Sequence, residues 1–309
     1  MRVTLAQIAP RLGRLADNLA AHRQILAEAW AGGSRLVVFP ELSLTGYLLR
    51  DYTSEVALTV EELAAHLAAV AAPAGAGPLE VVLGFVELSP GRQCYNAGAC
   101  FELAPDAAPR LVHLHRKVHL PTYGMFDERR YFNPGRRYQA FESPSLGRCG
   151  LLICEDLWHP SSVFVLSVDG PAFEGAGVLL GLANSPARGL TDTERFTVGN
   201  METWRRLNAL YAELYGLLVF HVQRVGVEDQ YIFSGGSQIL APGGEVLLEA
   251  PLFDEAIVSA EIDPAAVLRP HRSANPRALA EDVDLVRREL ERIGSAVYGA
   301  PGYHSEIDR

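Results

Sequence analysis

The sequence predicts an α/β fold, because short apolar runs alternate with longer stretches of helical periodicity. The runs are rich in Val, Leu and Ile, and each is short enough to be a strand buried on both faces. They lie at residues 3–9, 36–40, 80–86, 111–114, 150–154, 178–183 and 217–223. Strands of this kind form sheets that helices cover on their outer faces.

Three longer stretches have the pattern of amphipathic helices, with apolar residues at helical intervals and Ala, Glu and Arg between them. We expect these helices over Leu15 to Trp30, Glu55 to Val70 and Thr193 to Tyr215. Later in the chain, Pro242-Gly243-Gly244 separates two alternating stretches, at 237–240 and 245–248. Such a turn between alternating stretches is typical of a β-hairpin.

The domain is expected to end soon after a last strand at 256–262. We therefore expect one domain over residues 1–265. After Pro270 the composition changes to a charged helix, at about 276–293, and a polar tail. We interpret residues 266–309 as a C-terminal arm that takes part in oligomerisation, because such a segment adds little to a core.

The composition favours a small-molecule substrate. The 309 residues are 49% hydrophobic and carry a formal net charge of −10. Nucleic-acid binding depends on clustered Lys and Arg, so this acidic balance argues against it. The first residues lack the apolar core of a secretion signal, and no apolar run approaches the roughly 20 residues of a membrane span. We expect a cytoplasmic protein without a membrane partner.

The cysteines and histidines do not predict a metal site. Four cysteines lack the C-x-x-C spacing of a zinc site and are too few for a disulfide framework; they lie at 94, 100, 149 and 154. His113, His115 and His119 share one strand face but have no Asp-rich or Cys-rich motif to complement them. We interpret them as exposed residues at the end of a strand, and we expect neither a metal nor another cofactor.

Three apolar runs end in a reactive side chain. The runs deliver Glu41, Lys117 and Cys154. Ligand sites of α/β sheets gather at the carboxyl ends of strands, so these three side chains can surround one cleft. The sequence therefore predicts a carboxylate, an ammonium and a thiol in one site.

Cleavage of an amide requires this combination of groups. A thiol is mostly protonated at neutral pH, so a base such as Glu41 is needed to generate the thiolate of Cys154. Attack on the carbonyl creates an oxyanion, which the ammonium of Lys117 can stabilise. The same glutamate can then protonate the leaving ammonia and activate the hydrolytic water.

Three motifs resemble the Glu, Lys and Cys motifs of the nitrilase superfamily in their order and approximate spacing. They are Phe39-Pro40-Glu41-Leu42, His115-Arg116-Lys117-Val118-His119-Leu120 and Leu152-Ile153-Cys154-Glu155-Asp156. Further resemblance, at Tyr95-Asn96-Ala97, Phe132-Asn133-Pro134-Gly135, Ala183-Asn184 and Phe233-Ser234-Gly235-Gly236-Ser237, extends over residues 1–262. The resemblance implies a single four-layer α-β-β-α sandwich that forms a homo-oligomer.

Within that superfamily, the segment from Pro121 to Phe132 looks most like the glutaminase domain of glutamine-dependent NAD synthetases. The likeness implies that Glu128 is a second catalytic glutamate, which orients the lysine. It implies that Tyr47 and Tyr123 line the substrate. By the same likeness, Glu155 lies near the amino group of the substrate, and its backbone N–H joins the oxyanion site.

Glutamine or a related ω-amide is therefore the leading substrate. The sequence ends without the ATP-using synthetase domain of those enzymes, so we expect ammonia to be released or to pass to a separate synthetase. Hydrolysis of N-carbamoyl amino acids and of nitriles are alternatives, although nitrilases typically have Trp where this chain has Glu155. A noncatalytic metabolite- or synthetase-binding partner would be expected to lose Glu41, Lys117 or Cys154, and all three are present.

Overall fold

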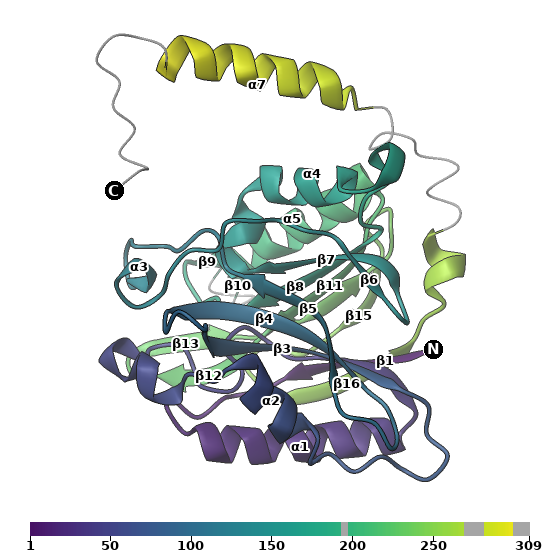
Figure 1. Ribbon diagram of the computed structural model, residues 1–309. Coiled ribbons are helices and arrows are strands. Elements are labelled where there is room, and N and C mark those ends of the chain that lie inside the picture. The colour runs from purple at the N-terminus through teal and green to yellow at the C-terminus, as the bar shows by residue number, and fades with distance from the viewer. Residues whose placement is uncertain (193–196, 269–280, 299–309) are drawn as a thin grey trace.

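The computed structural model describes residues 1–192, 197–268 and 281–298. The described residues form two six-stranded sheets that pack face to face (Figure 1). The first sheet has the order β16 (Ala256–Glu261), β1 (Arg2–Gln7), β2 (Ser34–Val38), β3 (Leu79–Leu88), β4 (Cys94–Leu103) and β5 (Arg110–Arg116). The second has the order β15 (Val246–Glu249), β14 (Gln238–Leu240), β11 (Leu218–Gln223), β8 (Val178–Ala183), β7 (Gly147–Ile153) and β6 (Phe141–Ser143).

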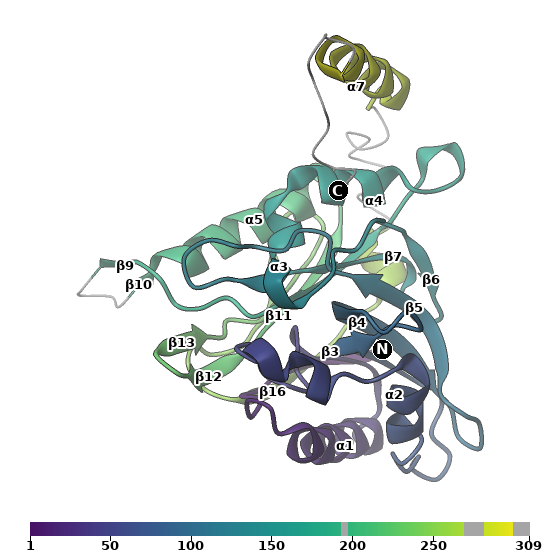
Figure 2. The same ribbon diagram turned by 60° about the vertical axis from the view of Figure 1, so that its left-hand side comes forward.

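Helices cover the outer face of each sheet, as both views show (Figure 1, Figure 2). The first sheet is covered by α1 (Leu15–Ala31) and α2 (Val60–Leu67), and the second by α4 (Pro160–Val168) and α5 (Gly199–Tyr215). This arrangement confirms the α-β-β-α sandwich expected from the sequence. The remaining described elements are short pairs of strands, single turns of helix and a C-terminal helix: β9 (Leu190–Asp192), β10 (Thr197–Val198), β12 (Val225–Glu228), β13 (Tyr231–Ser234), α3 (Glu128–Tyr131), α7 (Val283–Tyr298), the 3-10 helices η1 (Arg50–Val56), η2 (Cys154–Trp158) and η3 (Pro171–Phe173), and helical residues 264–268.

The alternation of side chains along each strand builds the layers, because successive residues point to opposite faces of a sheet. On β3, Leu83 and Phe85 pack under α1 and α2, whereas Val82 points between the two sheets. On β8, Leu180 packs between the sheets and Leu179 packs under the helices of the second sheet. The runs of consecutive apolar residues in these strands are therefore explained by burial on both faces.

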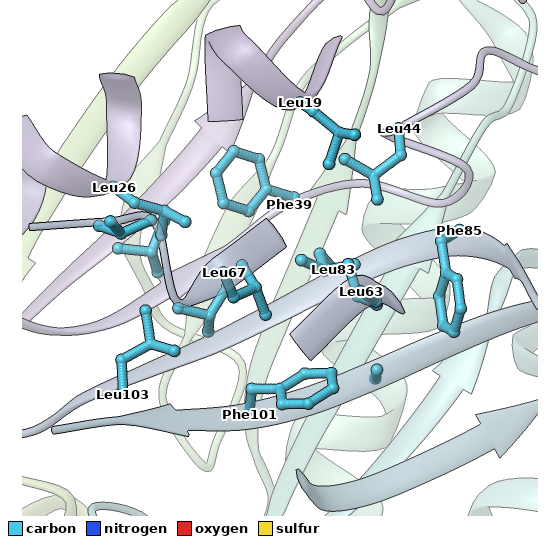
Figure 3. Close-up of a cluster of buried hydrophobic side chains, with 14 of the residues drawn as sticks. Leu19, Leu26, Phe39, Leu44, Leu63, Leu67, Leu83, Phe85, Phe101 and Leu103 are labelled. Atoms are coloured by element: carbon cyan, nitrogen blue, oxygen red, sulfur yellow. The ribbon is translucent and has the colours of Figure 1, made fainter. Parts of the chain in front are cut away.

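Figure 3 shows the outer core of the first sheet. Leu63 and Leu67 of α2 point toward Leu83 of β3, and Phe101 lies on the neighbouring strand β4. All four side chains are at most 4% exposed. Full burial of such a side chain contributes about 1.5–3 kcal/mol, so this cluster holds α2 on the sheet.

The expected strands are confirmed, and three of the expected helices have different bounds. The expected helix over Glu55 to Val70 is wrong at its start, because Thr59 caps α2 by accepting from the Glu62 N–H while the Glu62 carboxylate accepts from the Thr59 N–H. The preceding residues form η1 instead.

The other two differences concern the later helices. Helix α5 begins at Gly199 instead of residue 193, since 197–198 pair as a strand, and 193–196 lie outside the described residues. The expected helix at 276–293 is seen as α7, from Val283 to Tyr298, and residues 276–280 lie outside the description, as does the tail from Gly302.

Two observations bear on the rest of the chain. Val267 and Leu268, beyond the expected domain boundary at residue 265, still pack against the core between the sheets. None of the helices in the described part of the chain is long and apolar enough to cross a membrane.

Candidate active site

Glu41 follows strand β2 and is completely buried. Its Oε1 accepts hydrogen bonds from Asn96 Nδ2 at 2.7 Å and from Lys117 Nζ at 2.8 Å. Gly84 of β3 permits this position, because a Cβ there would lie 2.7 Å from the Cα of Glu41. The second oxygen, Oε2, has no hydrogen-bond partner within the described residues and is free to act on another group.

Lys117 follows β5, which runs in the same direction as β2, so the two strand ends meet at one edge of the first sheet. The ammonium is buried and donates to Glu41 Oε1 and, at 2.7 Å, to Glu128 Oε1. Burial alone would lower the pKa of Lys117, but Glu128 and Glu41 raise it well above its usual value. The side chain is therefore a fixed positive charge.

Glu128 opens the short helix α3 and is buried beside this ammonium. The hydroxyl of Tyr47 donates to its Oε1. Burial and the charge of Glu41 raise the pKa of Glu128 to about 7, although Lys117 opposes the shift. Tyr47 is itself held by Glu228, whose carboxylate accepts from the Tyr47 N–H at 3.0 Å.

Cys154 lies where β7 turns into η2, and the turn leaves it in a strained conformation with φ of 45°. A positive φ is costly for a residue with a side chain and clusters at functional sites. Burial and the charge of Glu41 raise the pKa of the thiol well above its usual value, while Lys117 and a backbone hydrogen bond at Asn184 lower it. The resting thiol is therefore protonated at neutral pH and needs a base.

Asp156 ties the turn that carries Cys154 to the strand end that carries Lys117. Its Oδ1 accepts from the backbone N–H groups of Val118, at 3.1 Å, and His119, at 2.8 Å. Its Oδ2 lies 2.8 Å from His115 Nε2, and both side chains are buried. These hydrogen bonds hold the turn that carries Cys154, at the end of β7 in the second sheet, against the end of β5 in the first sheet.

Beside this buried cluster lie Tyr123, Phe126, Glu155 and Arg188, which we call the rim. The rim carries charges of both signs. The hydroxyl of Tyr123, a side chain that is 53% exposed, donates to Glu155 at 2.9 and 3.1 Å. Burial and this carboxylate raise the pKa of Tyr123 to about 12. Phe126 packs edge-on against Tyr123, and the guanidinium of Arg188 lies over Phe126, 4.7 Å from the ring centre. Within the described residues, that guanidinium has no carboxylate partner.

The comparisons with known proteins identify the family. The carbon-nitrogen hydrolase family model matches residues 2–269. The chain belongs to the carbon-nitrogen hydrolase family.

This carbon-nitrogen hydrolase domain is similar to relatives of different lengths. The chain is 32% identical over 263 residues to a glutamine-dependent NAD(+) synthetase from Thermotoga maritima. The matched region is 85% of this chain and 42% of the relative. It is 32% identical over 258 residues to an (R)-stereoselective amidase from a Pseudomonas species, covering 81% of each. A solved carbon-nitrogen hydrolase from Helicobacter pylori, 23% identical, covers 94% of this chain and 99% of its own, with a TM-score of 0.78, and supports the fold.

The chain therefore spans less than half the length of the T. maritima synthetase and most of the length of the amidase. The nitrilase-superfamily resemblance drawn from the motifs is confirmed, as is the likeness to glutamine-dependent NAD synthetases. Roles for individual residues of this carbon-nitrogen hydrolase remain predictions.

The structure brings the four predicted catalytic residues together. Glu41 and Glu128 contact Lys117, and the charges of all three act on the thiol of Cys154. Of the predicted substrate residues, Tyr123 and Glu155 meet at the rim, whereas Tyr47 is buried against Glu128.

Sequence reasoning missed the connecting residues of this carbon-nitrogen hydrolase. Asn96 and Asp156 lay within the quoted motifs without an assigned role, and Arg188 was left unassigned. The expectation that the strand-end histidines are exposed is wrong: His115 is 3% exposed and pairs with Asp156, and His113 and His119 are half-buried. Within the part of the chain that the structure describes, no group of three His, Cys, Asp or Glu side chains could hold a metal ion.

Proposed function

We propose that the chain hydrolyses a small primary amide through a thioester on Cys154 and releases ammonia. One observation carries the proposal: Lys117 is held between Glu41 and Glu128, at 2.8 and 2.7 Å, beside the strained thiol. A buried ammonium between two carboxylates cannot swing away, so it is preorganised for a negative charge that forms nearby.

In the first step, Glu41 takes the thiol proton while the sulfur attacks the amide carbon. The carbonyl electrons move to oxygen, and the oxyanion is stabilised by Lys117 and by the backbone N–H of Glu155. Glu41 Oε2, which has no partner among the described residues, is the atom available for the proton. The low dielectric of the buried site strengthens each of these electrostatic interactions.

In the second step, the tetrahedral intermediate collapses. The carbon-nitrogen bond breaks, and the proton held by Glu41 goes to the leaving nitrogen, which departs as ammonia. A water molecule then gives a proton to Glu41 and attacks the thioester, and the thiolate leaves and is reprotonated. The products are the carboxylic acid and the original enzyme, so Glu41 acts in turn as base and acid.

The rim supports a substrate with an α-amino-acid head. Glu155 presents a carboxylate that can pair with the substrate ammonium, and Arg188 presents a guanidinium that can pair with the substrate carboxylate. Glutamine carries both groups and a terminal amide, so it is the leading substrate. The name of the T. maritima relative, a glutamine-dependent enzyme, supports the same choice.

The amidase relative supports a second candidate substrate, an amide other than glutamine, because its similarity extends along most of both chains. N-carbamoyl amino acids offer Arg188 a carboxylate but offer Glu155 no ammonium, so the carboxylate of Glu155 favours glutamine over them. A nitrile is the weaker candidate, because nitrilases typically have Trp where this chain has Glu155. A noncatalytic binding role leaves the cluster around Lys117 without a purpose.

Ammonia is either released or used by a separate synthetase chain, which would be a partner of this domain. We also propose that residues 266–309 form an oligomerisation arm. On α7, Val283, Val286, Leu290 and Ile293 follow one another at intervals of three and four residues, which places them on one face of the helix. Leu290 is 64% and Ile293 48% exposed, so this apolar face is open to a second copy of the chain.

Ammonia release measured across a panel of amides tests the proposed activity. The panel comprises glutamine, asparagine, ω-amides without an amino or carboxylate group, carbamoyl amino acids and nitriles. We expect the highest kcat/KM for glutamine, and no release by Cys154→Ala. Release from nitriles alone, or equal release by the variant, would contradict the proposal.

A further inference from the structure

A hollow lies along the free edge of the first sheet, away from the groups that the proposed reaction uses. Strand β5 is the last strand of its sheet and, among the residues that the structure describes, pairs with β4 alone. Residues 134–139 pass beside it without joining the sheet. Between them is a cavity of about 320 Å³, which we call the β5-edge pocket. This volume lies at the lower end of the range for small-molecule sites, roughly 300–1,000 Å³.

The lining of the β5-edge pocket is basic. Three arginines are among the residues that line it, Arg116, Arg136 and Arg137, and no Asp or Glu is. Arg116 is already neutralised, because it donates to both oxygens of Glu87 at 2.5 and 2.6 Å. Arg136 and Arg137 have no ion-pair partner among the described residues. The chain has a formal charge of −10, yet this hollow holds two positive charges without an ion-pair partner among the described residues. Such a pair of charges favours the binding of an anion.

The walls of the pocket are fixed by the protein itself. The Gly135 N–H donates to the Lys117 carbonyl at 2.7 Å, and a Cβ on Gly135 would lie 2.0 Å from the carbonyl oxygen of Arg116. Only glycine allows this close approach. Tyr95 forms another wall, with the guanidinium of Arg116 stacked 4.0 Å above its ring centre. The hollow therefore exists before any ligand arrives.

A further polar group of the lining lacks a partner. His113 stacks on Phe141, and its Nε2 is buried without a hydrogen bond to any described residue. Burial and the neighbouring His115 lower the pKa of His113 to about 4, so the ring is neutral at pH 7. A neutral ring can donate a hydrogen bond to an anion without adding a charge.

We propose that the β5-edge pocket binds a small molecule that carries a phosphate group. The two free guanidinium groups match a charge of about −2, which a phosphate monoester approaches at pH 7 and a single carboxylate does not. The planar fork of Arg also fits phosphate oxygens in pairs. The site is distinct from the proposed active site, so it does not depend on the proposed amidase activity.

Isothermal titration of the full chain with inorganic pyrophosphate tests this site, with citrate, a carboxylate anion of comparable charge, at equal ionic strength as the comparison. We expect pyrophosphate to bind and citrate to bind at least tenfold more weakly. Binding of the two anions with equal affinity would overturn the assignment to phosphate. Absence of pyrophosphate binding up to roughly 10 mM would overturn the site itself.

The matched variants are two Arg-Arg pairs of the same charge. Arg136→Ala/Arg137→Ala should weaken pyrophosphate binding at least tenfold, because both free guanidinium groups are lost. Arg129→Ala/Arg130→Ala removes two exposed arginines outside the pocket and should leave the affinity within about twofold, since screening limits distant charges. Equal losses in both pairs would show that only the overall charge matters. If the first variant does not fold, Arg136→Gln/Arg137→Gln provides the same test.

Discussion

The carboxylate of Asp156 lies 2.8 Å from His115 Nε2 and thereby joins the turn of the nucleophile to the strand that delivers Lys117. Neither residue contacts the atoms that react in the proposed mechanism. This contact shows how two separate sheets can keep the side chains of Lys117 and Cys154 at fixed positions relative to each other. A displacement of about 1 Å in such a set can reduce the rate on the order of 100-fold.

Asp156→Asn should therefore lower kcat, on the order of 100-fold, with little change in KM. The amide cannot accept all the hydrogen bonds from Val118, His119 and His115 that the carboxylate accepts. Steady-state kinetics with glutamine, beside a thermal melt, separates positioning from unfolding. Leu157→Met, a conservative change at the next residue, is the control. An increase in KM alone would assign Asp156 to substrate binding instead.

The pKa of Glu128, raised to about 7, predicts an acid limb in the pH profile. The ionised carboxylate holds the ammonium of Lys117, so kcat/KM should rise with pH through about 7 as Glu128 loses its proton. Glu128→Gln should lower the rate and abolish this limb, because glutamine does not titrate. The measurement is kcat/KM between about pH 5.5 and 8.5. An unchanged limb in the variant would assign it to another group.

The opposite charges on the rim predict opposite selectivities. Glu155→Gln should reduce kcat/KM for glutamine about tenfold relative to its des-amino analogue, since only glutamine loses a charged contact. Tenfold corresponds to the low end of the range of about 1.5–3 kcal/mol for a charged hydrogen bond, because the Glu155 side chain is partly exposed to solvent.

Arg188→Gln should discriminate instead against glutamine relative to its decarboxylated analogue, again about tenfold. The matched measurement uses both analogues with both variants. A pattern in which each variant loses activity equally on all three amides would remove the basis for an amino-acid head at this rim.

The apolar face of α7 predicts that the arm takes part in assembly. Leu290→Glu/Ile293→Glu places charges on that face and should reduce the oligomer mass measured by light scattering. Arg288→Gln/Ser295→Glu changes the charge by the same amount on the opposite face of the helix and should leave the mass unchanged. A charge buried in an interface costs far more than one on a surface. Equal masses for the wild type and the first variant would contradict the assigned role.

The sequence predicted the layers of the fold better than its individual boundaries. Runs of Val, Leu and Ile identify doubly buried strands, but β4 has Asn96, Ala97, Gly98 and Ala99 at its centre and shows no such run. These small residues let the sheets approach, since a Cβ on Gly98 would lie 3.2 Å from Leu151 and Leu182. The Thr59–Glu62 capping box could have located the start of α2.

The candidate site was predictable where a reactive side chain ends a strand, as with Glu41, Lys117 and Cys154. The supporting contacts were not, because they join residues far apart in the chain. Asn96 reaches Glu41 across 55 positions, and His115 reaches Asp156 across 41. Arg188 lies in a loop without a strand pattern, so only its place over Phe126 indicates a role.

Trapping the covalent intermediate tests the central claim most directly. The purified chain is mixed with glutamine, quenched in acid within the first turnovers and digested for mass spectrometry. We predict an adduct on Cys154 with the mass of glutamine less ammonia, absent from Cys154→Ala and from Cys149. An adduct elsewhere, or ammonia release by Cys154→Ala at the wild-type rate, would contradict the proposed thioester mechanism.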